Sequence, residues 1–271
     1  MLDDATPPDP QPTLNASFFD VLQSVREEPA DLGSADAGII CRCKDGSEYV
    51  VKDGTSKDSA PIVPHCEWFC SELGEAINII IPRHKIIRLI DGTYVFGSHI
   101  ISGLIDPDEN GAGYWFHLVK DGTIDLSKIA PVLSHIYAFD HFIHNVDRHG
   151  RNFLVQKQRT EYAVYAIDYS RAWLRWDFPS PNLPMPGNTV DCQRWFRNFW
   201  AKSYIDSSEV DDALARIRNL PQDRIRRIIE DHPPDWLSET QKNAILAWWG
   251  SADFIKRLDA ISEGVKDGTC L

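Results

Sequence analysis

A regular hydrophobic pattern lies between residues 129 and 143. Apolar side chains there recur at steps of three and four residues, which is the period of one face of an α-helix. They are Ile129, Val132, Leu133, Ile136, Phe139 and Ile143. We therefore expect a helix over residues 129–143 that buries this face in a core. Asp140 belongs to the same helix, where it either hydrogen-bonds the segment that follows or faces solvent.

The first third of the chain shows an alternating pattern that is typical of β-strands. Residues 38–43 and 48–51 alternate and are rich in β-branched side chains, and the turn between them contains an Asp-Gly pair. This combination predicts a β-hairpin. Residues 82–89 and 93–101 predict two further strands, again separated by Asp-Gly.

The other predicted elements are helices. Residues 66–77 are helical in character and follow Pro64, and residues 15–28 predict an amphipathic leader helix. The C-terminal part predicts further helices at residues 209–219, at 224–230, after a capping box at 238–241, and at 253–261. Strands followed by helices indicate an α+β fold, with a small β-rich part and a larger helical part.

Two short polar segments interrupt this pattern and carry the candidate chemistry. Residues 144–155 read HNVDRHGRNFLV, which places Asp147, Arg148, His149 and Asn152 within six positions. Residues 165–170 read YAIDYS, with Asp168 at the end of an apolar stretch. We expect strands at residues 153–155 and 163–167 joined by a polar turn. Such a hairpin would return Asp168 to the end that carries Asn152.

These residue types at this spacing fit phosphoryl transfer from ATP. One carboxylate, Asp147, would orient an attacking hydroxyl, while the amide of Asn152 and the carboxylate of Asp168 would hold Mg²⁺ on the phosphates. Each residue alone would be read more simply as a turn or strand-end residue. The four fixed positions followed by a strand-terminal Asp favour the catalytic interpretation. The sequence therefore predicts a kinase that uses ATP and Mg²⁺.

At these two segments the sequence resembles a known family. The DRHxxN motif, the strand that ends in Asp and the preceding FDHFIHNVDRH are similar to the loops of HipA-like kinases. These are bacterial relatives of the phosphatidylinositol 3- and 4-kinases and of protein kinases. The resemblance covers residues 36–260 and implies a two-lobed, protein-kinase-like fold. It also implies that Arg148 and His149 brace the catalytic loop around Asp147. One departure is DYS at 168–170, where protein kinases have DFG.

A kinase also needs a lysine for the α- and β-phosphates and an acid that holds it. Lys52 ends the predicted strand in YVVK, which is the position of that lysine in kinases. Glu67, in the predicted helix that follows, is the candidate partner for an ATP-binding ion pair. Glu72 and Glu75 share this helix, but Glu72 is five residues further on and points in another direction. The simpler alternative is a surface lysine and an acid favoured by the helix dipole.

The absence of a glycine-rich phosphate loop narrows the class of kinase. Neither GxGxxG nor GxxxxGK[ST] occurs in the chain, which argues against P-loop NTPases and typical protein kinases. HipA-like kinases, by resemblance, do not need either motif. Cys41 and Cys43, or Cys66 and Cys70 with His65, match no common zinc-binding spacing.

The composition of the chain limits its size class, the partners it could bind and its location. The chain has 271 residues, 43% of them hydrophobic, which is enough for one two-lobed unit with a sizeable core. Its net charge is −12 and no stripe of Lys and Arg is present, so direct binding of nucleic acid is not expected. No apolar stretch is long enough to span a bilayer. Six cysteines without a signal peptide indicate a reduced, cytoplasmic location.

The expected organisation has three parts. Residues 1–13 are an acidic, proline-rich tail, predicted to be disordered. Residues 14–105 are the N-lobe with the phosphate-binding lysine, and residues 106–271 are the helical C-lobe. Residues 97–106 are expected to contain the hinge that meets adenine. Four prolines between 179 and 186 predict an extended loop in the place of an activation or substrate-binding segment.

The leading interpretation is a kinase that phosphorylates a Ser or Thr of a protein. Resemblance to the family implies a toxin of a toxin–antitoxin system, with an antitoxin-type partner. Three alternatives stay open at this point. The acceptor is a lipid or small molecule, the chain is a kinase-fold binding module without catalysis, or it is an unrelated helical scaffold with an accidental motif. In that last case Asn152 and Asp168 would lie apart.

Overall fold

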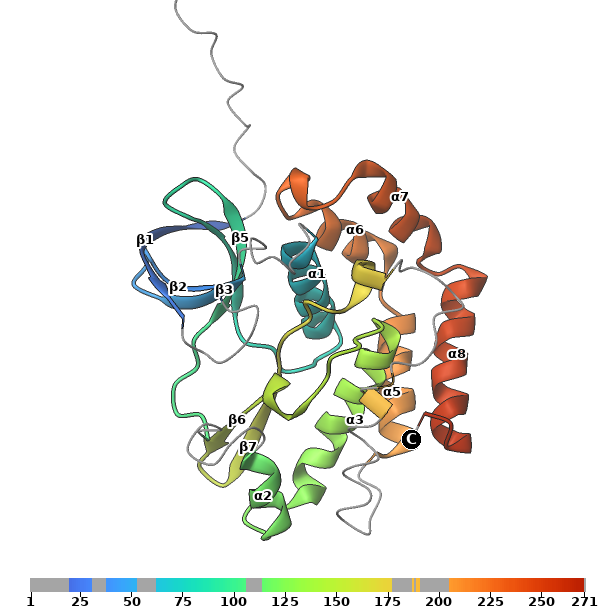
Figure 1. Cartoon of the computed structure of the whole chain (residues 1–271). Helices are drawn as coiled ribbons and strands as arrows, with labels where there is room; N and C mark the ends of the chain where they lie inside the picture. The colour runs from blue at the N-terminus through green and yellow to red at the C-terminus, as the bar shows by residue number, and fades with distance from the viewer. Residues whose placement is uncertain are drawn as a thin grey trace, which may run out of the picture.

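Figure 1 shows the chain as a computed structural model. The structure describes residues 20–30, 38–52, 62–105, 114–176, 187, 189–190 and 205–270. The predicted N-terminal tail and the predicted proline-rich loop at 179–186 lie outside these residues.

The N-terminal strands form a closed barrel. Its strands are β1 (Val21–Pro29), β2 (Ile39–Cys43), β3 (Glu48–Lys52), β4 (His84–Arg88) and β5 (Tyr94–His99). Their order around the barrel is β1-β2-β3-β5-β4, and β1 closes it by pairing with β4 in parallel while the other pairs are antiparallel. The barrel interior is apolar. Buried residues there include Cys41, Cys43, Tyr49, Val51, Ile87, Leu89 and Val95.

The predicted hairpins are confirmed. Strands β2 and β3 pair through a turn in which Gly46 has φ +84° and the carboxylate of Asp45 accepts a hydrogen bond from N of Ser47 (2.9 Å). Strands β4 and β5 pair around Gly92, which has φ +95°. Glycine adopts this left-handed conformation without steric cost, which is why the Asp-Gly pairs were informative.

The predicted leader helix at residues 15–28 is wrong for its described part, because Val21–Pro29 is strand β1. Short apolar runs fit both helical and strand periods, so the pattern did not decide between them. The pairing of this segment with β4 makes it a strand. Val21 and Leu22 lie beside Ile86 and Ile87 of β4, and without β1 the barrel would have an open edge.

Helix α1 (Val63–Ala76) lies between the barrel and the C-terminal helices (Figure 1). It corresponds to the helix predicted at residues 66–77, and most of its side chains are buried. Trp68 donates a hydrogen bond from its indole nitrogen to the carbonyl of Ile228 (3.0 Å), and Phe69 stacks on Trp173 with ring centroids 4.3 Å apart. The helix is therefore packed against both parts of the molecule.

The larger part begins with α2 (Tyr114–Lys120), which was not predicted, and α3 (Leu126–Phe142). Helix α3 corresponds to the predicted helix, and residues 143–149 follow it as a loop. The hairpin β6 (Phe153–Gln158) and β7 (Glu161–Ala166) follows, with strands longer than predicted and a tight turn between them.

The C-terminal part of the chain forms the predicted helical array (Figure 1). Its elements are α5 (Ser207–Arg218), α6 (Gln222–Glu230), η3 (Pro234–Trp236), α7 (Glu239–Trp248) and α8 (Ala252–Asp267). The predicted capping box at Ser238 and Gln241 is present at the start of α7. Helix α8 extends beyond its predicted end. In the described part of the chain, no helix is long and apolar enough to cross a membrane.

Candidate active site

Arg148 organises the loop between α3 and β6. Its guanidinium makes a bidentate pair with Asp140, with distances of 2.7 Å from Nε to Oδ2 and 2.9 Å from Nη2 to Oδ1. The two side chains are 2% and 0% exposed. Burial alone would lower the pKa of Arg148, but the adjacent Asp140 carboxylate outweighs it and raises this pKa. The guanidinium of Arg148 is therefore held in its charged form inside the protein.

The same guanidinium joins the two predicted loops. Nη1 of Arg148 donates hydrogen bonds to the carbonyls of Asn152 (2.6 Å) and Ile167 (2.7 Å). N of Ile167 also donates to the carbonyl of Asn152 (3.2 Å). Because Phe153 pairs with Ala166 at the open end of the hairpin, Asn152 and the residue before Asp168 are neighbours. The predicted convergence of the two segments is therefore present.

Asn145 and Asn152 fix the backbone of Asp147 from both sides. The amide of Asn145 donates to Asp140 (2.9 Å) and accepts from N of Asp147 (3.2 Å). The amide nitrogen of Asn152 donates to the carbonyl of Asp147 (2.8 Å), so the other terminal atom of this amide is its acceptor oxygen. Of the two alternatives for Asp140, the structure shows the hydrogen-bonded one. Asn145 was not singled out from the sequence, although it lies within the HNVDRH motif.

The carboxylate of Asp147 is less enclosed than the network behind it. Its side chain is partly exposed, and Oδ2 lies 3.5 Å from Nε of Arg171. His149 is exposed, and its Nδ1 accepts a hydrogen bond from N of Arg151 (3.2 Å) at the start of η1 (Gly150–Asn152). It therefore caps a short turn, whereas Arg148 supports the whole loop.

A second network joins the barrel, α1 and the segment after β7. Nζ of Lys52 lies 2.7 Å from Oε1 of Glu67 and 2.5 Å from Oδ1 of Asp168. The other oxygen of Glu67 accepts a hydrogen bond from N of Tyr169 (3.1 Å). The predicted Lys52–Glu67 ion pair is present, and the contact between Lys52 and Asp168 was not foreseen. The phosphate-binding role of this lysine stays a prediction.

Charge compensation sets the ionisation of these groups. Burial would lower the pKa of Lys52, but Glu67 and Asp168 outweigh it and raise this pKa. Burial would raise the pKa of Asp168, but Lys52 and the hydrogen bonds of Ser170 hold it well below the usual range. Burial raises the pKa of Glu67, because Lys52 only partly offsets it. Asp168 is thus the firmly ionised carboxylate of the set.

The backbone at Asp168 adopts an unusual conformation that orients its carboxylate. Its φ is +64°, in the left-handed region that few residues other than glycine adopt. Oγ of Ser170 donates to Oδ1 of Asp168 (2.7 Å), the same oxygen that meets Lys52. N of Ser170 also lies 3.4 Å from Oδ1, so Lys52 and Ser170 contact the same oxygen of this carboxylate. Ser170 therefore acts on the predicted metal ligand, a contact that the sequence did not indicate.

The segment after Asp168 is anchored in the core. Tyr169 is buried, with its ring edge-to-face against Phe139 at 5.8 Å and beside the guanidinium of Arg148 at 5.2 Å. Trp173 is buried against α1 through Phe69. Tyr169 at the second position of DYS thus packs against α3 and the loop between α3 and β6.

A family model described as HipA-like kinase matches residues 29–262. No curated protein matches the chain in sequence. Among solved structures, the Helicobacter pylori proinflammatory kinase CtkA is similar over 92% of this chain and 99% of its own, with a TM-score of 0.57 and 15% identity. This likeness confirms the expected protein-kinase-like α+β fold with its β-rich and helical parts.

Two further structures are more distant. HipA from Shewanella oneidensis MR-1, in a complex with HipB and operator DNA, aligns over 81% of this chain and 60% of its own, with a TM-score of 0.46 and 15% identity. A Golgi casein kinase with Mn/ADP bound aligns over 95% of this chain and 74% of its own, with a TM-score of 0.45 and 15% identity.

Proposed function

The chain belongs to the HipA-like kinase family, and on that premise we propose that it transfers the γ-phosphate of Mg²⁺-bound ATP to a protein Ser or Thr hydroxyl. The observation that carries the proposal is the convergence of Lys52, Glu67 and Asp168 from three separate elements. A lysine between two acids at this place fits a phosphate subsite beside a cation subsite.

The nucleotide would lie between the barrel and the catalytic loop. Lys52 would pair with the α- and β-phosphates while Glu67 keeps it in place. Asn152 and Asp168 offer amide and carboxylate oxygens, which suit Mg²⁺. Bound magnesium would neutralise charge on the phosphates.

Asp147 would orient the acceptor hydroxyl in line with the γ-phosphate and accept a hydrogen bond from it. Its partly exposed carboxylate and its backbone, fixed by Asn145 and Asn152, support this role. Arg148 would hold the loop, and His149 would shape its following turn. Rate enhancement would then come from positioning and electrostatics.

A protein acceptor is favoured over a lipid because the net charge of −12 opposes approach to an anionic membrane surface. Family membership supports an antitoxin-type protein partner and a growth-arresting role. Direct contact with nucleic acid forms no part of the proposal.

Melting of wild type and Asp168→Ala, with and without Mg²⁺ and ATP, tests nucleotide binding. A ligand at one hundred times its dissociation constant adds about 2.7 kcal/mol. We expect a magnesium-dependent rise in Tm for wild type that is lost in Asp168→Ala. A shift of equal size in both proteins would remove Asp168 from the site.

Asp147→Ala separates catalysis from binding. It should keep the magnesium-dependent rise in Tm and lose phosphate transfer, measured with radiolabelled ATP and a protein extract. Wild-type turnover in this variant would refute the role of Asp147. Binding without transfer in the wild type, across protein, lipid and small-molecule acceptors, would favour the inactive binding module.

A further inference from the structure

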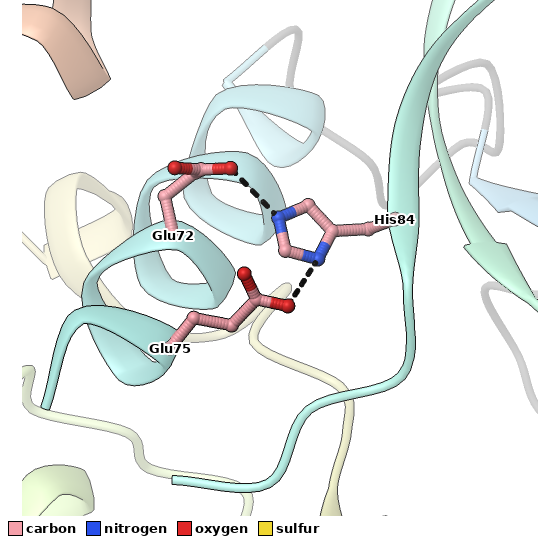
Figure 2. Close-up of side chains that lie close together, drawn as sticks. All are labelled: Glu72, Glu75 and His84. Carbon is pink, nitrogen blue, oxygen red and sulfur yellow. Dashed lines mark hydrogen bonds and ion pairs between the residues drawn. The ribbon is translucent and has the colours of Figure 1, made fainter. Parts of the chain in front are cut away.

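Figure 2 shows a second group of polar side chains, between the half of α1 beyond Glu67 and the start of β4. Glu72 and Glu75 lie about one turn apart on α1, and His84 faces them from the start of β4. Nε2 of His84 is 3.2 Å from Oε1 of Glu72, and Nδ1 is 3.7 Å from Oε1 of Glu75. The proposed phosphate transfer uses none of the three.

Both ring nitrogens of His84 lie close to oxygen atoms. Nδ1 lies 3.2 Å from the carbonyl of Pro82, which can only accept, so Nδ1 carries a hydrogen. In this tautomer the lone pair of Nε2 faces the carboxylate of Glu72, in the arrangement of two ligand atoms of one metal ion.

The surroundings of the ring resemble those of a metal-binding histidine. A ligating histidine usually donates its other N–H to a carbonyl or carboxylate, as Nδ1 does here to Pro82. The ring is held between Trp68, edge-on at 5.5 Å, and Phe96, stacked at 5.7 Å. Its side chain is 3% exposed, so its orientation is fixed before any ion arrives.

Glu72 is oriented in the same way. Its second oxygen accepts a hydrogen bond from Nη2 of Arg224 (3.1 Å), which directs Oε1 to the ring. Glu75 lies at the open side with its side chain 45% exposed, which leaves it free to turn toward an ion.

We propose that Glu72, Glu75 and His84 form a binding site for a divalent transition-metal ion, with Zn²⁺ as the best match. Their ligand atoms lie within 4.8 Å of one another. Two atoms bound to a tetrahedral zinc ion lie roughly 3.3 Å apart, close to the 3.2 Å between Nε2 and Glu72. One nitrogen and two carboxylate oxygens leave a fourth position for water. Mg²⁺ is disfavoured because it prefers oxygen ligands alone.

A similar cluster elsewhere gives a matched comparison. His135 on α3 lies 3.0 Å from Glu209 and 3.4 Å from Asp212, both on α5. Here the same nitrogen, Nε2, faces both carboxylates, so one ring proton shared between them satisfies the cluster. Asp212 also pairs with Arg216 at 2.6 Å through that oxygen. This cluster therefore does not require a further cation.

An ion at the proposed site would join the end of α1 to β4. The same helix carries Glu67, so the ion would also restrain the element that holds the Lys52–Glu67 pair. Metal binding itself does not rest on phosphate transfer, and its failure would leave the proposed kinase activity untouched.

The test is a zinc titration of chelator-treated full-length protein, without nucleotide or magnesium, in competition with a chromophoric chelator. Wild type should bind one equivalent. Glu75→Gln, at an exposed position that should tolerate the change, and His84→Gln should each weaken binding at least about tenfold. Glu209→Gln and Asp168→Ala should bind as wild type does. X-ray absorption should show nitrogen and oxygen neighbours at about 2.0–2.2 Å and no sulfur at about 2.3 Å.

Several results would overturn the proposal. No stoichiometric binding by wild type would mean that Glu72, Glu75 and His84 hold no metal ion. Loss of binding in Glu209→Gln or Asp168→Ala, with Glu75→Gln unaffected, would place the ion elsewhere. Sulfur neighbours would assign it to the cysteines. Unchanged affinity in Glu75→Gln would also sink it, whatever the behaviour of His84→Gln.

Discussion

The two charged networks of the candidate site are built differently. The Arg148–Asp140 pair lies within the helical part, with side chains 2% and 0% exposed, and its remaining donors reach backbone carbonyls of the same region. Lys52, Glu67 and Asp168 come from the barrel, α1 and the segment after β7. The side chains of Lys52 and Asp168 are 14% and 19% exposed.

This difference indicates that the Arg148–Asp140 network supports the fold, whereas the groups of the Lys52 network can exchange their partners for ligands. The Arg148 guanidinium has its partners inside the protein, so any change in them leaves a buried charge. Lys52 instead shares its charge between two carboxylates. In the proposed reaction it would turn to the phosphates, and Asp168 would turn to a cation. The first network should therefore govern stability and the second should govern ligand binding and transfer.

Asp140→Ala should give the largest loss of stability. It leaves the buried guanidinium of Arg148 without its carboxylate, and breaking one side of a buried pair costs roughly 3–5 kcal/mol. Urea unfolding measures the loss. Asp259→Ala, which breaks an exposed pair with Arg218, is the matched control and should cost about 1 kcal/mol or less. Similar losses of stability in the two variants would mean that the buried Arg148–Asp140 pair is no more important for stability than an exposed pair.

Lys52→Met should cost less stability and more activity. It leaves Glu67 and Asp168 adjacent, but burial already raises the pKa of Glu67, so this carboxyl can take up a proton. We expect a loss of about 1–3 kcal/mol, because the unpaired group neutralises itself. Phosphate transfer should fall to background. A stability loss as large as that of Asp140→Ala would make Lys52 structural as well.

The features of this site that the sequence predicts are those that depend on residues within one element or hairpin of readable pattern. The Lys52–Glu67 pair and the approach of Asn152 to the Asp168 segment follow from a strand, a helix and a hairpin of readable pattern. The contact of Lys52 with Asp168 joins residues 116 positions apart. It depends on how the barrel docks, which no local pattern encodes.

The fold shows the same division. Hairpins with Asp-Gly turns and helices with long apolar repeats were predictable, because their signals lie within a few residues. Strand β1 was mistaken for a helix because its role is to close a barrel against β4, a strand far along the chain. The partner of Asp140 stayed open for a related reason. Asp140 is polar within an apolar face, and only the docking of Arg148 shows what it binds.

Acid unfolding should show how much the ionised carboxylate of Asp168 contributes to stability. Its pKa is held below the unfolded value of 3.8, so its contribution to stability is present above that value and is lost as pH falls further. Between pH 2 and 6, Asp168→Asn should therefore show a shallower loss of Tm than wild type. Parallel curves for the two proteins would mean that Lys52 does not stabilise this carboxylate.

Arg224→Ala should have the smallest effect and addresses what holds α1 in place. Arg224 pairs with Glu72 at the half of α1 beyond Glu67, at a partly exposed position. Screening by solvent limits such a pair to about 0–1 kcal/mol. The helix is buried through Trp68 and Phe69, so in metal-free buffer the variant should unfold close to wild type and keep its response to Mg²⁺ and ATP. If the variant lost its response to Mg²⁺ and ATP, the charges at this end of α1 would be needed to position the Lys52–Glu67 pair. Stability and ligand binding could then not be assigned to separate groups of residues on α1.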